Sequence, residues 1–508
     1  MRRLLVIVAV VIVVVLAACV FGIRALAGGA GKDRIAGALT NALGMPVSIG
    51  EMSVSVLPTP TLDAGHIKIG SGDSAAAPGV TVGSLHVVPN VLSFFPGRTR
   101  SIERIDLVGL TVSARRDKSG KWLIPVPAPS AAGGGGGAGG AKSSSGGIDL
   151  NGLHVRDGAL RVVDDSLRTA AGASNITTIT AIDADLSLVA GALTISSFTG
   201  RLGQTVVTGS ASSGPTGTSL HLASTSIENA DLPSLFALAG MRPYPGLSIG
   251  GTAPFDMTTT IGPDLQTFTV AGKAAIQRVQ LGTIALQDLQ APFTFDKKVF
   301  TLDPIAFTLY KGREQGKVAI DMTTPTPSYT IRTAIVGLDV DQALSANTTM
   351  KGKLLGTARL SANVRASGAA EPEIEKTLTG TVGFGVINGT ITGFPLLGQI
   401  DQALKIAGSS GNDTKFDSLT GTATVGGGKA RTNDLILKTG AVTVLGQGTF
   451  GFDKSLNFKM NTQVSGITVP ITVAGTASAP KFGVDVQSLA KKQVQSEVQK
   501  QLGKLLPH

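Results

Sequence analysis

The first pattern along the chain is an unbroken apolar run, Leu4–Ile23, that follows Arg2 and Arg3 and is closed by Arg24. A helix of this length, rising about 1.5 Å per residue, spans about 30 Å, which is the thickness of a bilayer core. The two arginines before the run favour a cytoplasmic N-terminus. We therefore expect residues 1–28 to form a cytoplasmic tip and a transmembrane signal anchor, with the rest of the chain outside the cytoplasm.

A second interpretation of this run rests on Cys19, the one cysteine of the chain. Residues 16–19, Leu-Ala-Ala-Cys, resemble a bacterial lipobox, in which the cysteine becomes the lipidated first residue. A lipoprotein usually turns polar soon after that cysteine, whereas this apolar run continues to Ile23. Three alternatives stay open: a retained anchor, lipidation at Cys19 and ordinary signal cleavage. We expect the retained anchor.

After the anchor, apolar residues recur at intervals of three and four from Lys32 to Leu43, and Gly44 follows. This spacing predicts a short helix. From Pro46 onward the period changes to two, which predicts strands with one dry face and one wet face. The clearest alternating segments are 52–56, 66–69, 84–87 and 105–112, and a charged turn is expected at 116–120.

A segment with no means of burying a core then interrupts the strands. Three prolines between residues 125 and 129 lead into residues 131–147, which are almost wholly Gly, Ala and Ser. This composition is typical of a flexible linker. We therefore expect an N-terminal module of a short helix and strands over residues 31–128, followed by a Gly/Ser/Ala linker over residues 129–147.

Short strand segments resume at Ile148 and continue to Val486. A break containing Gly, Asn or Asp comes about every 8–12 residues, as in sheet meanders and barrels. Short helices are expected at 232–238 and 396–406. The last part of the chain predicts a basic amphipathic helix at 489–506, which either caps the sheet or contacts a membrane surface or a partner. The expected divisions are a central β region (148–375), a C-terminal β region (376–486) and a C-terminal amphipathic helix (487–508).

The composition supports a mainly β protein. Charged residues make up 15% and aromatic residues 4% of the chain, and there are 66 glycines. Val, Ile and Thr favour strands, while Gly, Asn and Asp supply turns. We therefore expect a mainly β, antiparallel sheet with one N-terminal transmembrane helix and a few short helices. The net charge of +10 is scattered and lacks basic clusters with aromatic residues, so nucleic acid is not an expected partner.

One segment resembles a nucleotide site. Residues 136–143 approximate a phosphate-binding loop, with Ala141 in place of the glycine before the lysine. Such a loop must follow a buried strand and open a helix, so that backbone N–H groups converge on phosphate. Here a proline-rich stretch precedes it and further Ser and Gly follow, so we assign the segment to the linker.

The titratable residues show no catalytic or metal-binding pattern. The five histidines lack metal-ligand spacing, and His66 and His86 fall on the polar side of alternating segments. Two pairs of aspartates each place carboxylates on one strand face, but no further carboxylates follow at loop spacing. We expect solvated turn residues there, and no enzyme activity, cofactor or bound metal. The two pairs are Asp183 with Asp185 and Asp339 with Asp341.

Two parts of the chain resemble the AsmA family. Residues 32–124 are similar to its N-terminal region, with a short helix, a strand ending in a Leu-Pro-x-Pro turn (57–60) and a closing Gly-Lys-Trp turn (120–122). Residues 376–486 resemble its C-terminal region more closely, through the order and spacing of short motifs. These motifs are residues 378–380, 388–391, 414–419, 446–450, 469–471, 473–476 and 479–482. The middle of the chain is similar only in style, and the long linker departs from the family pattern.

The resemblance implies an envelope protein of a Gram-negative bacterium, held in the inner membrane by Leu4–Ile23, with most of the chain in the periplasm. The family is linked to outer-membrane assembly, and its members resemble bridge-type lipid carriers with a long curved sheet whose concave face is apolar. For this chain the resemblance implies an elongated, trough-like sheet. Its expected partners are phospholipid or another envelope lipid, together with envelope proteins.

The residues agree with that shape without requiring it. A dry face of Val, Ile, Leu and Ala suits acyl chains, and each buried CH₂ group contributes about 0.8 kcal/mol, so no specific residue is needed. The alternative fold is a sandwich or barrel whose dry face is its core, and the alternative function is that of a secreted or surface adhesive β-protein. The candidate positions in an apolar trough are Val444, Phe450, Phe458 and Val473.

Overall fold

The computed structural model is mainly β and consists of two compact units, unit 1 (Met1–Gly272) and unit 2 (Lys273–His508). It describes residues 32–43, 45–55, 59–70, 78–90, 93, 101–123, 149–168, 174–189, 192–214, 217–238, 246–262, 268–347, 351–393, 413–440, 442–464 and 467–484. Within these residues no helix is long and apolar enough to cross a membrane.

Several sequence predictions lie outside the described residues. They are the anchor Leu4–Ile23 with Cys19, the linker 129–147 with the loop-like segment 136–143, and the helices at 396–406 and 489–506.

The two other predicted helices are confirmed. Helix α2 (Lys32–Leu43) buries Ile35 and Leu39, one turn apart, against the sheet of unit 1. Its Thr40 hydroxyl accepts a hydrogen bond of 3.0 Å from the N–H of Val47, which ties the helix to the first strand. Helix α3 (Leu232–Leu238) follows a short 3₁₀ turn, η2 (Asn229–Asp231).

The described residues of unit 1 form fourteen strands, and β15 (Phe268–Leu281) contains the boundary to unit 2. The strands are β1 (Val47–Ser48), β2 (Glu51–Ser55), β3 (Thr61–Gly70), β4 (Gly79–Pro89), β5 (Ser101–Val108), β6 (Thr111–Arg116), β7 (Trp122–Leu123), β8 (Asp149–Arg168), β9 (Ser174–Val189), β10 (Ala192–Leu202), β11 (Thr205–Gly214), β12 (Gly217–Ser224), β13 (Leu247–Gly250) and β14 (Phe255–Ile261).

The predicted antiparallel sheet is wrong at one place in unit 1. Strand β8 pairs in parallel with both β5 and β6, through registers such as Leu107 with Val155 and Ala114 with Val162. A parallel pair needs a long crossover connection, and residues 124–148 supply the necessary length between β7 and β8. The segments before and after the linker therefore share hydrogen bonds of one sheet.

The alternating segment 105–112 is two strands and not one. Gly109 adopts φ = 65°, a left-handed conformation that suits glycine, and it separates β5 from β6. Strand interiors also contain residues with positive φ, such as His66 in β3 and Asn388 in β21. The buried positions of β3 change phase at His66, although its pairing with β4 keeps one register. At Asn388 the pairing of β21 with β20 shifts by one residue, which marks a β-bulge.

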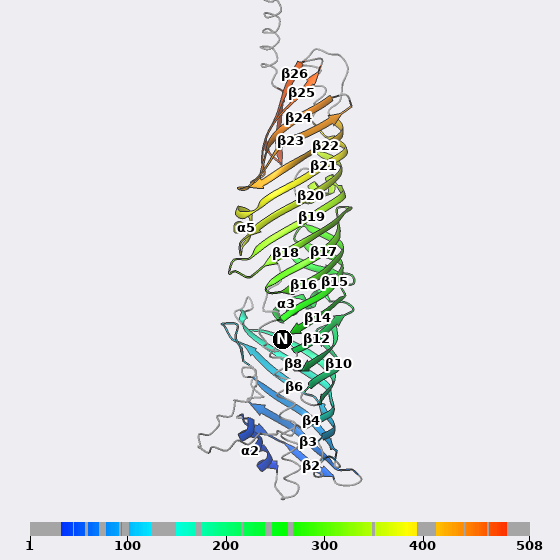
Figure 1. Ribbon diagram of the computed structural model, residues 1–508, viewed down its shortest axis with the longest axis vertical. Coiled ribbons are helices and arrows are strands. Elements are labelled where there is room, and N and C mark those ends of the chain that lie inside the picture. The colour runs from blue at the N-terminus through cyan, green and yellow to red at the C-terminus, as the bar shows by residue number, and fades with distance from the viewer. Residues whose placement is uncertain are drawn as a thin grey trace, which may run out of the picture. The chain divides into compact units, whose positions relative to one another are not determined.

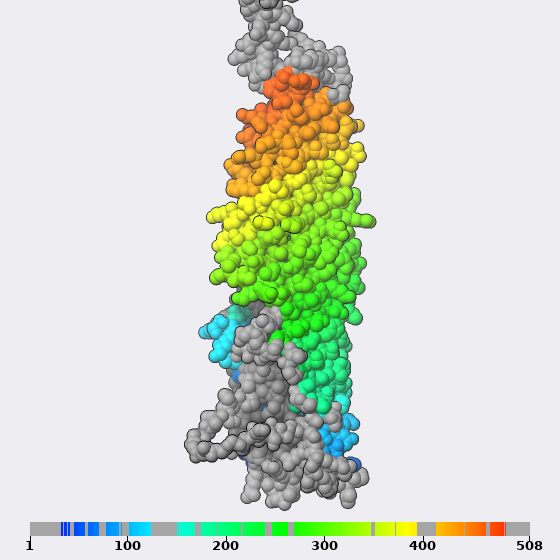
Figure 2. Space-filling model, viewed as in Figure 1, coloured from blue at the N-terminus to red at the C-terminus, as the bar shows by residue number. Residues whose placement is uncertain are grey.

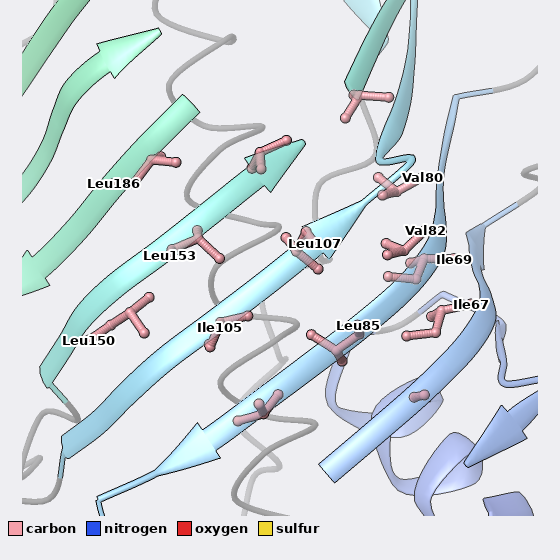
Figure 3. Packing of buried hydrophobic residues seen from close by; sticks show 14 of the residues in the cluster. Ile67, Ile69, Val80, Val82, Leu85, Ile105, Leu107, Leu150, Leu153 and Leu186 are labelled. Carbon is pink, nitrogen blue, oxygen red and sulfur yellow. The ribbon is translucent and has the colours of Figure 1, made fainter. Parts of the chain in front are cut away.

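That face of unit 1 is a closed core. Ile105 and Leu107 of β5 are 0% exposed, and Leu150 and Leu153 of β8 are each 1% exposed. Figure 3 shows these side chains beside those of β3, β4 and β9 on the same side of the strands, with α2 close by. In unit 1 the dry face predicted from alternation is therefore packed like the interior of a globular domain.

The predicted charged turn at 116–120 begins one residue too early. Arg116 ends β6 and is buried, with its Nη1 atom 2.8 Å from Oδ2 of Asp164 in β8. Its Nη2 group donates a hydrogen bond of 3.3 Å to the carbonyl oxygen of Leu238 at the end of α3. The turn itself is formed by Asp117, whose carboxylate accepts hydrogen bonds from Ser119 and Lys121.

Unit 2 is an antiparallel meander in which each strand from β16 to β27 pairs with the next. The strands are β16 (Ile284–Asp296), β17 (Val299–Leu309), β18 (Gly312–Asp321), β19 (Ser328–Asp339), β20 (Leu354–Ser367), β21 (Thr379–Ile391), β22 (Thr414–Gly426), β23 (Lys429–Thr439), β24 (Val442–Gly451), β25 (Ser455–Val464), β26 (Ile467–Thr476) and β27 (Ala479–Val484), with α4 (Val340–Asn347) after β19 and α5 (Glu371–Thr377) after β20. Figure 1 shows these strands side by side in chain order.

Candidate functional site

One face of the unit 2 sheet carries an unbroken line of apolar side chains and glycines. Directly paired residues of neighbouring strands point to the same face, so the register can be followed from strand to strand. One such line crosses all strands from β16 to β27, and we call it the apolar row. It consists of Phe293, Leu302, Val318, Ile331, Val364, Gly380, Val425, Ala430, Phe450, Leu456, Gly475 and Pro480.

The line of residues next to it points to the opposite face and is polar in all but one position. This polar row consists of Lys317, Arg332, Asn363, Thr381, Thr424, Arg431, Thr449, Asn457, Ala474 and Lys481. On each strand from β18 to β27, the residue next to a member of the apolar row belongs to the polar row. The sheet therefore has one apolar face and one polar face. In the space-filling view the side chains of these strands close the spaces between the ribbons (Figure 2).

The apolar row is less covered than the core of unit 1. Every member except Val425 keeps partial exposure, and Phe450 is 38% exposed. The buried core side chains of unit 1 are 0–9% exposed. A packed domain leaves few such apolar side chains open to water, and a contiguous open patch marks a binding surface. The apolar row therefore has exposed apolar surface that another molecule could cover.

A second line on the same face is buried at every position except Leu419, which is partly exposed, and we call it the covered row. It lies toward the strand ends next to α4, whose Val340, Ala343 and Leu344 belong to the same hydrophobic cluster. Val444 is 1% exposed and Val469 is 0% exposed. The covered row consists of Leu338, Ala358, Val386, Leu419, Leu437, Val444, Thr462 and Val469. The apolar face thus has a closed margin and a partly open middle.

All four candidate positions from the sequence lie on this face. Phe450 is in the apolar row, while Phe458 and Val473 are paired with each other on β25 and β26 and are partly exposed. Val444 belongs to the covered row, where its side chain is enclosed. The structure therefore brings the four onto one face and separates Val444 from the other three by its burial.

The apolar face also holds a carboxyl group that sequence reasoning missed. Glu314 of β18 is paired with Phe307 of β17 and with Ile335 of β19, so its side chain is on the apolar side. Its side chain is 4% exposed. Oε1 accepts a hydrogen bond of 2.6 Å from the hydroxyl of Thr333, whereas Oε2 has no hydrogen-bond partner among the described residues.

Glycine makes room for this carboxyl group. Gly316 follows Glu314 by two residues on the same face, and a Cβ atom there would clash with Oε1 of Glu314. The carboxyl group is therefore folded back over the strand, between apolar neighbours. A signal for its position exists in the sequence, because the alternation of Val318 and Ile320, extended backwards, places Glu314 on the apolar phase.

We expect Glu314→Gln to stabilise the protein at neutral pH. Burial raises the pKa of the Glu314 carboxyl, and the hydrogen bond from Thr333 opposes this only in part. A raised pKa means that the folded protein binds the proton more tightly than the unfolded chain. Stability is therefore lost as the pH rises through the ordinary value of 4.5 and levels off above the folded pKa.

Glutamine keeps the shape of the side chain and removes this loss. Calorimetry of both proteins across pH 4–8 should show a higher melting temperature for the variant near pH 7 and near-identical values at the acid end. A parallel pH dependence of the two proteins would contradict the assignment of the loss to Glu314.

Unit 1 carries a different polar arrangement on the face opposite its core. Successive strand pairings align Asp63, His86, Asp106, His154 and Asp185 in one row across β3, β4, β5, β8 and β9. Nδ1 of His86 is 2.6 Å from Asp63, and Nδ1 of His154 is 2.7 Å from Asp185. The hydrogen bond with His154, followed by that from Arg156, lowers the pKa of Asp185.

The carboxylate pairs noted in the sequence are held by protein donors. Asp183 and Asp185 lie within β9 and not in a turn, and Asp183 accepts a hydrogen bond of 3.0 Å from the N–H of Asp157. Asp339 ends β19 and accepts from the N–H of Gln342, which caps α4, while Asp341 accepts from the N–H of Gly352. The described residues contain no group of three or more His, Cys, Asp or Glu placed to hold a metal ion.

Comparison with known proteins gives one assignment. No curated protein and no solved structure matches the chain significantly. A family model matches residues 257–435. This range starts in the central region, which resembled the family only in style, and it contains three of the seven C-terminal motifs. The other four motifs and residues 32–124 lie outside it. It contains Glu314 and the part of the apolar row from Phe293 to Ala430. The matched model describes the AsmA family, so residues 257–435 of this chain are similar to proteins of that family.

Proposed function

We propose that unit 2 carries lipid acyl chains on its apolar face, and that the protein contributes in this way to assembly of the outer membrane without enzymatic activity. The similarity of residues 257–435 to the AsmA family supports a role in envelope assembly in general. The location we propose is the inner membrane, with Leu4–Ile23 as a single-pass anchor and the rest of the chain in the periplasm.

The observation that carries this proposal is the partial exposure of the apolar row. Twelve strands in succession place only apolar side chains or glycine in this row, yet eleven of the twelve positions remain partly exposed. A row that faces only solvent usually carries polar residues, whereas an apolar row that forms a core is buried, as in unit 1. The row suits a ligand that is itself apolar and removable.

Acyl chains fit this surface on energetic grounds. Each CH₂ group transferred from water to an apolar contact contributes about 0.8 kcal/mol, so a chain of ordinary lipid length gains several kcal/mol without any specific contact. The low share of aromatic residues leaves a face formed mainly by aliphatic side chains. Binding would then depend on the continuity of the face and not on a single residue.

The test is photo-crosslinking from the two faces of one strand. A photoreactive amino acid replaces Phe450, which is 38% exposed on the apolar face, or Leu445, which is 50% exposed and on the opposite face of β24. After irradiation of cells, mass spectrometry should find lipid adducts at position 450 and few at position 445. Equal adduct yields, or none at position 450, would contradict the proposal.

A further inference from the structure

Oε2 of Glu314 is a buried hydrogen-bond acceptor without a partner among the described residues, and it lies on the apolar face. An ionised or polar group that is buried without a partner costs free energy, and native structures rarely leave one in place without a role. Among the described residues only one other buried side-chain oxygen lacks a partner, the hydroxyl of Thr259 in unit 1. A bare carboxylate oxygen is the more costly of the two because the group can carry a charge.

The surroundings of Glu314 specify what would satisfy it. Phe307 and Ile335 flank it on the neighbouring strands and offer no hydrogen-bond donor, and Thr333 is already bound to Oε1. A ligand must therefore supply the donor to Oε2, while the rest of that ligand is compatible with an apolar face. A lipid whose headgroup carries N–H donors meets both requirements.

The place of Glu314 along its strand agrees with a headgroup. It is the third residue of β18, just inside the β17–β18 turn formed by Tyr310 and Lys311. A headgroup bound there would lie near the ends of the strands, with its acyl chains directed across the apolar row. Lys311 in this turn is 67% exposed and pairs with Asp339, so the lipid phosphate would find a cation close to the same edge.

We propose that Glu314 binds the ammonium group of an amine-bearing phospholipid, such as one with an ethanolamine headgroup, and thereby gives the apolar face a headgroup preference. This inference rests on the proposed function, since it assumes that acyl chains occupy the apolar face. A primary ammonium brings both a positive charge and N–H donors to Oε2. A choline headgroup brings the charge without the donors, and a glycerol headgroup brings donors with a net negative charge.

The test uses the full chain in membranes and three photoactivatable phospholipids. The probes share one diazirine-bearing acyl chain and differ only in an ethanolamine, choline or glycerol headgroup. Cross-linked peptides of β17–β20 are quantified by mass spectrometry for the wild type and for Glu314→Gln. We expect ethanolamine probe to label the wild type at least about five-fold more than choline probe, which corresponds to about 1 kcal/mol.

The variant should lose the preference and keep the binding. In Glu314→Gln the ratio of ethanolamine to choline yield should fall to about one, while labelling of unit 2 by both probes persists. A melting temperature no lower than that of the wild type shows that the variant is folded. Equal yields in the wild type, or a preference that persists in the variant, would overturn this inference and leave lipid carriage intact. No labelling of unit 2 by any probe would overturn the proposed function itself.

Discussion

Replacement of Asp164 by alanine is expected to lower the free energy of unfolding by about 3–5 kcal/mol, because it leaves the buried Arg116 guanidinium without its carboxylate. The two side chains are 2% and 9% exposed and lie 2.8 Å apart. Asp164 also accepts hydrogen bonds through Oδ1 from the N–H and hydroxyl of Ser166 and from the N–H of Leu167, so the same change loosens the end of β8.

Calorimetry of the full chain checks this prediction. The melting transition that includes unit 1 should fall on the order of 10 °C in Asp164→Ala. Arg104→Ala is the matched control, since it breaks an ion pair to Asp106 whose arginine is 59% exposed, and exposed pairs contribute roughly 0–1 kcal/mol. Removal of both charges in Arg116→Met with Asp164→Leu should recover much of the loss. A fall no larger than that of the control would contradict the assigned role of the pair.

Replacement of Ile331 by aspartate is expected to abolish most lipid binding by unit 2. Ile331 lies in the apolar row between Val318 and Val364 and is the fourth residue of β19. A carboxylate there would have to lose its hydration when an acyl chain covers it, and that cost exceeds the gain from several CH₂ groups. Because the position is only partly buried when no lipid is bound, the sheet itself should tolerate the change.

The neighbouring residue supplies the matched control. Thr330→Asp introduces the same charge one residue earlier, on the opposite face, where residue 330 is paired with Arg365. Lipid adducts at a photoreactive residue in position 450 should fall at least several-fold in Ile331→Asp and remain at the wild-type level in Thr330→Asp. Equal adduct yields in the two variants, with both proteins folded by circular dichroism, would show that the apolar row is not the lipid surface.

Local patterns in the sequence predicted helices and strands whose formation depends mainly on residues close together in the chain. The spacing of apolar residues in 32–43 predicted α2 with its observed bounds, because a helix satisfies its hydrogen bonds within itself. The short helix expected at 232–238 is α3. Alternation predicted strands at 66–69 and 84–87 for a similar reason, since side chains of a strand alternate between two faces.

Other features depended on partners far away in the chain. The parallel pairing of β8 with β5 and β6 brings together segments on either side of the linker, and alternation carries no information about strand direction. The Arg116–Asp164 pair joins residues 48 positions apart, so Arg116 resembled an ordinary turn residue. Glu314 was not identified from the sequence, although the phase of Val318 and Ile320 includes it, because no local pattern shows whether a carboxyl group on that phase is buried.

The sequence by itself determined that this protein is mainly β, with strands that have one dry and one wet face, because period-two alternation is a local property of the chain. Only the tertiary structure decided what each dry face does. In unit 1 the side chains of the dry face are buried, and Leu107 is 0% exposed; in unit 2 the apolar row stays partly open, and Phe450 is 38% exposed. Exposure depends on which remote segments pack against a face, and no local pattern contains that information.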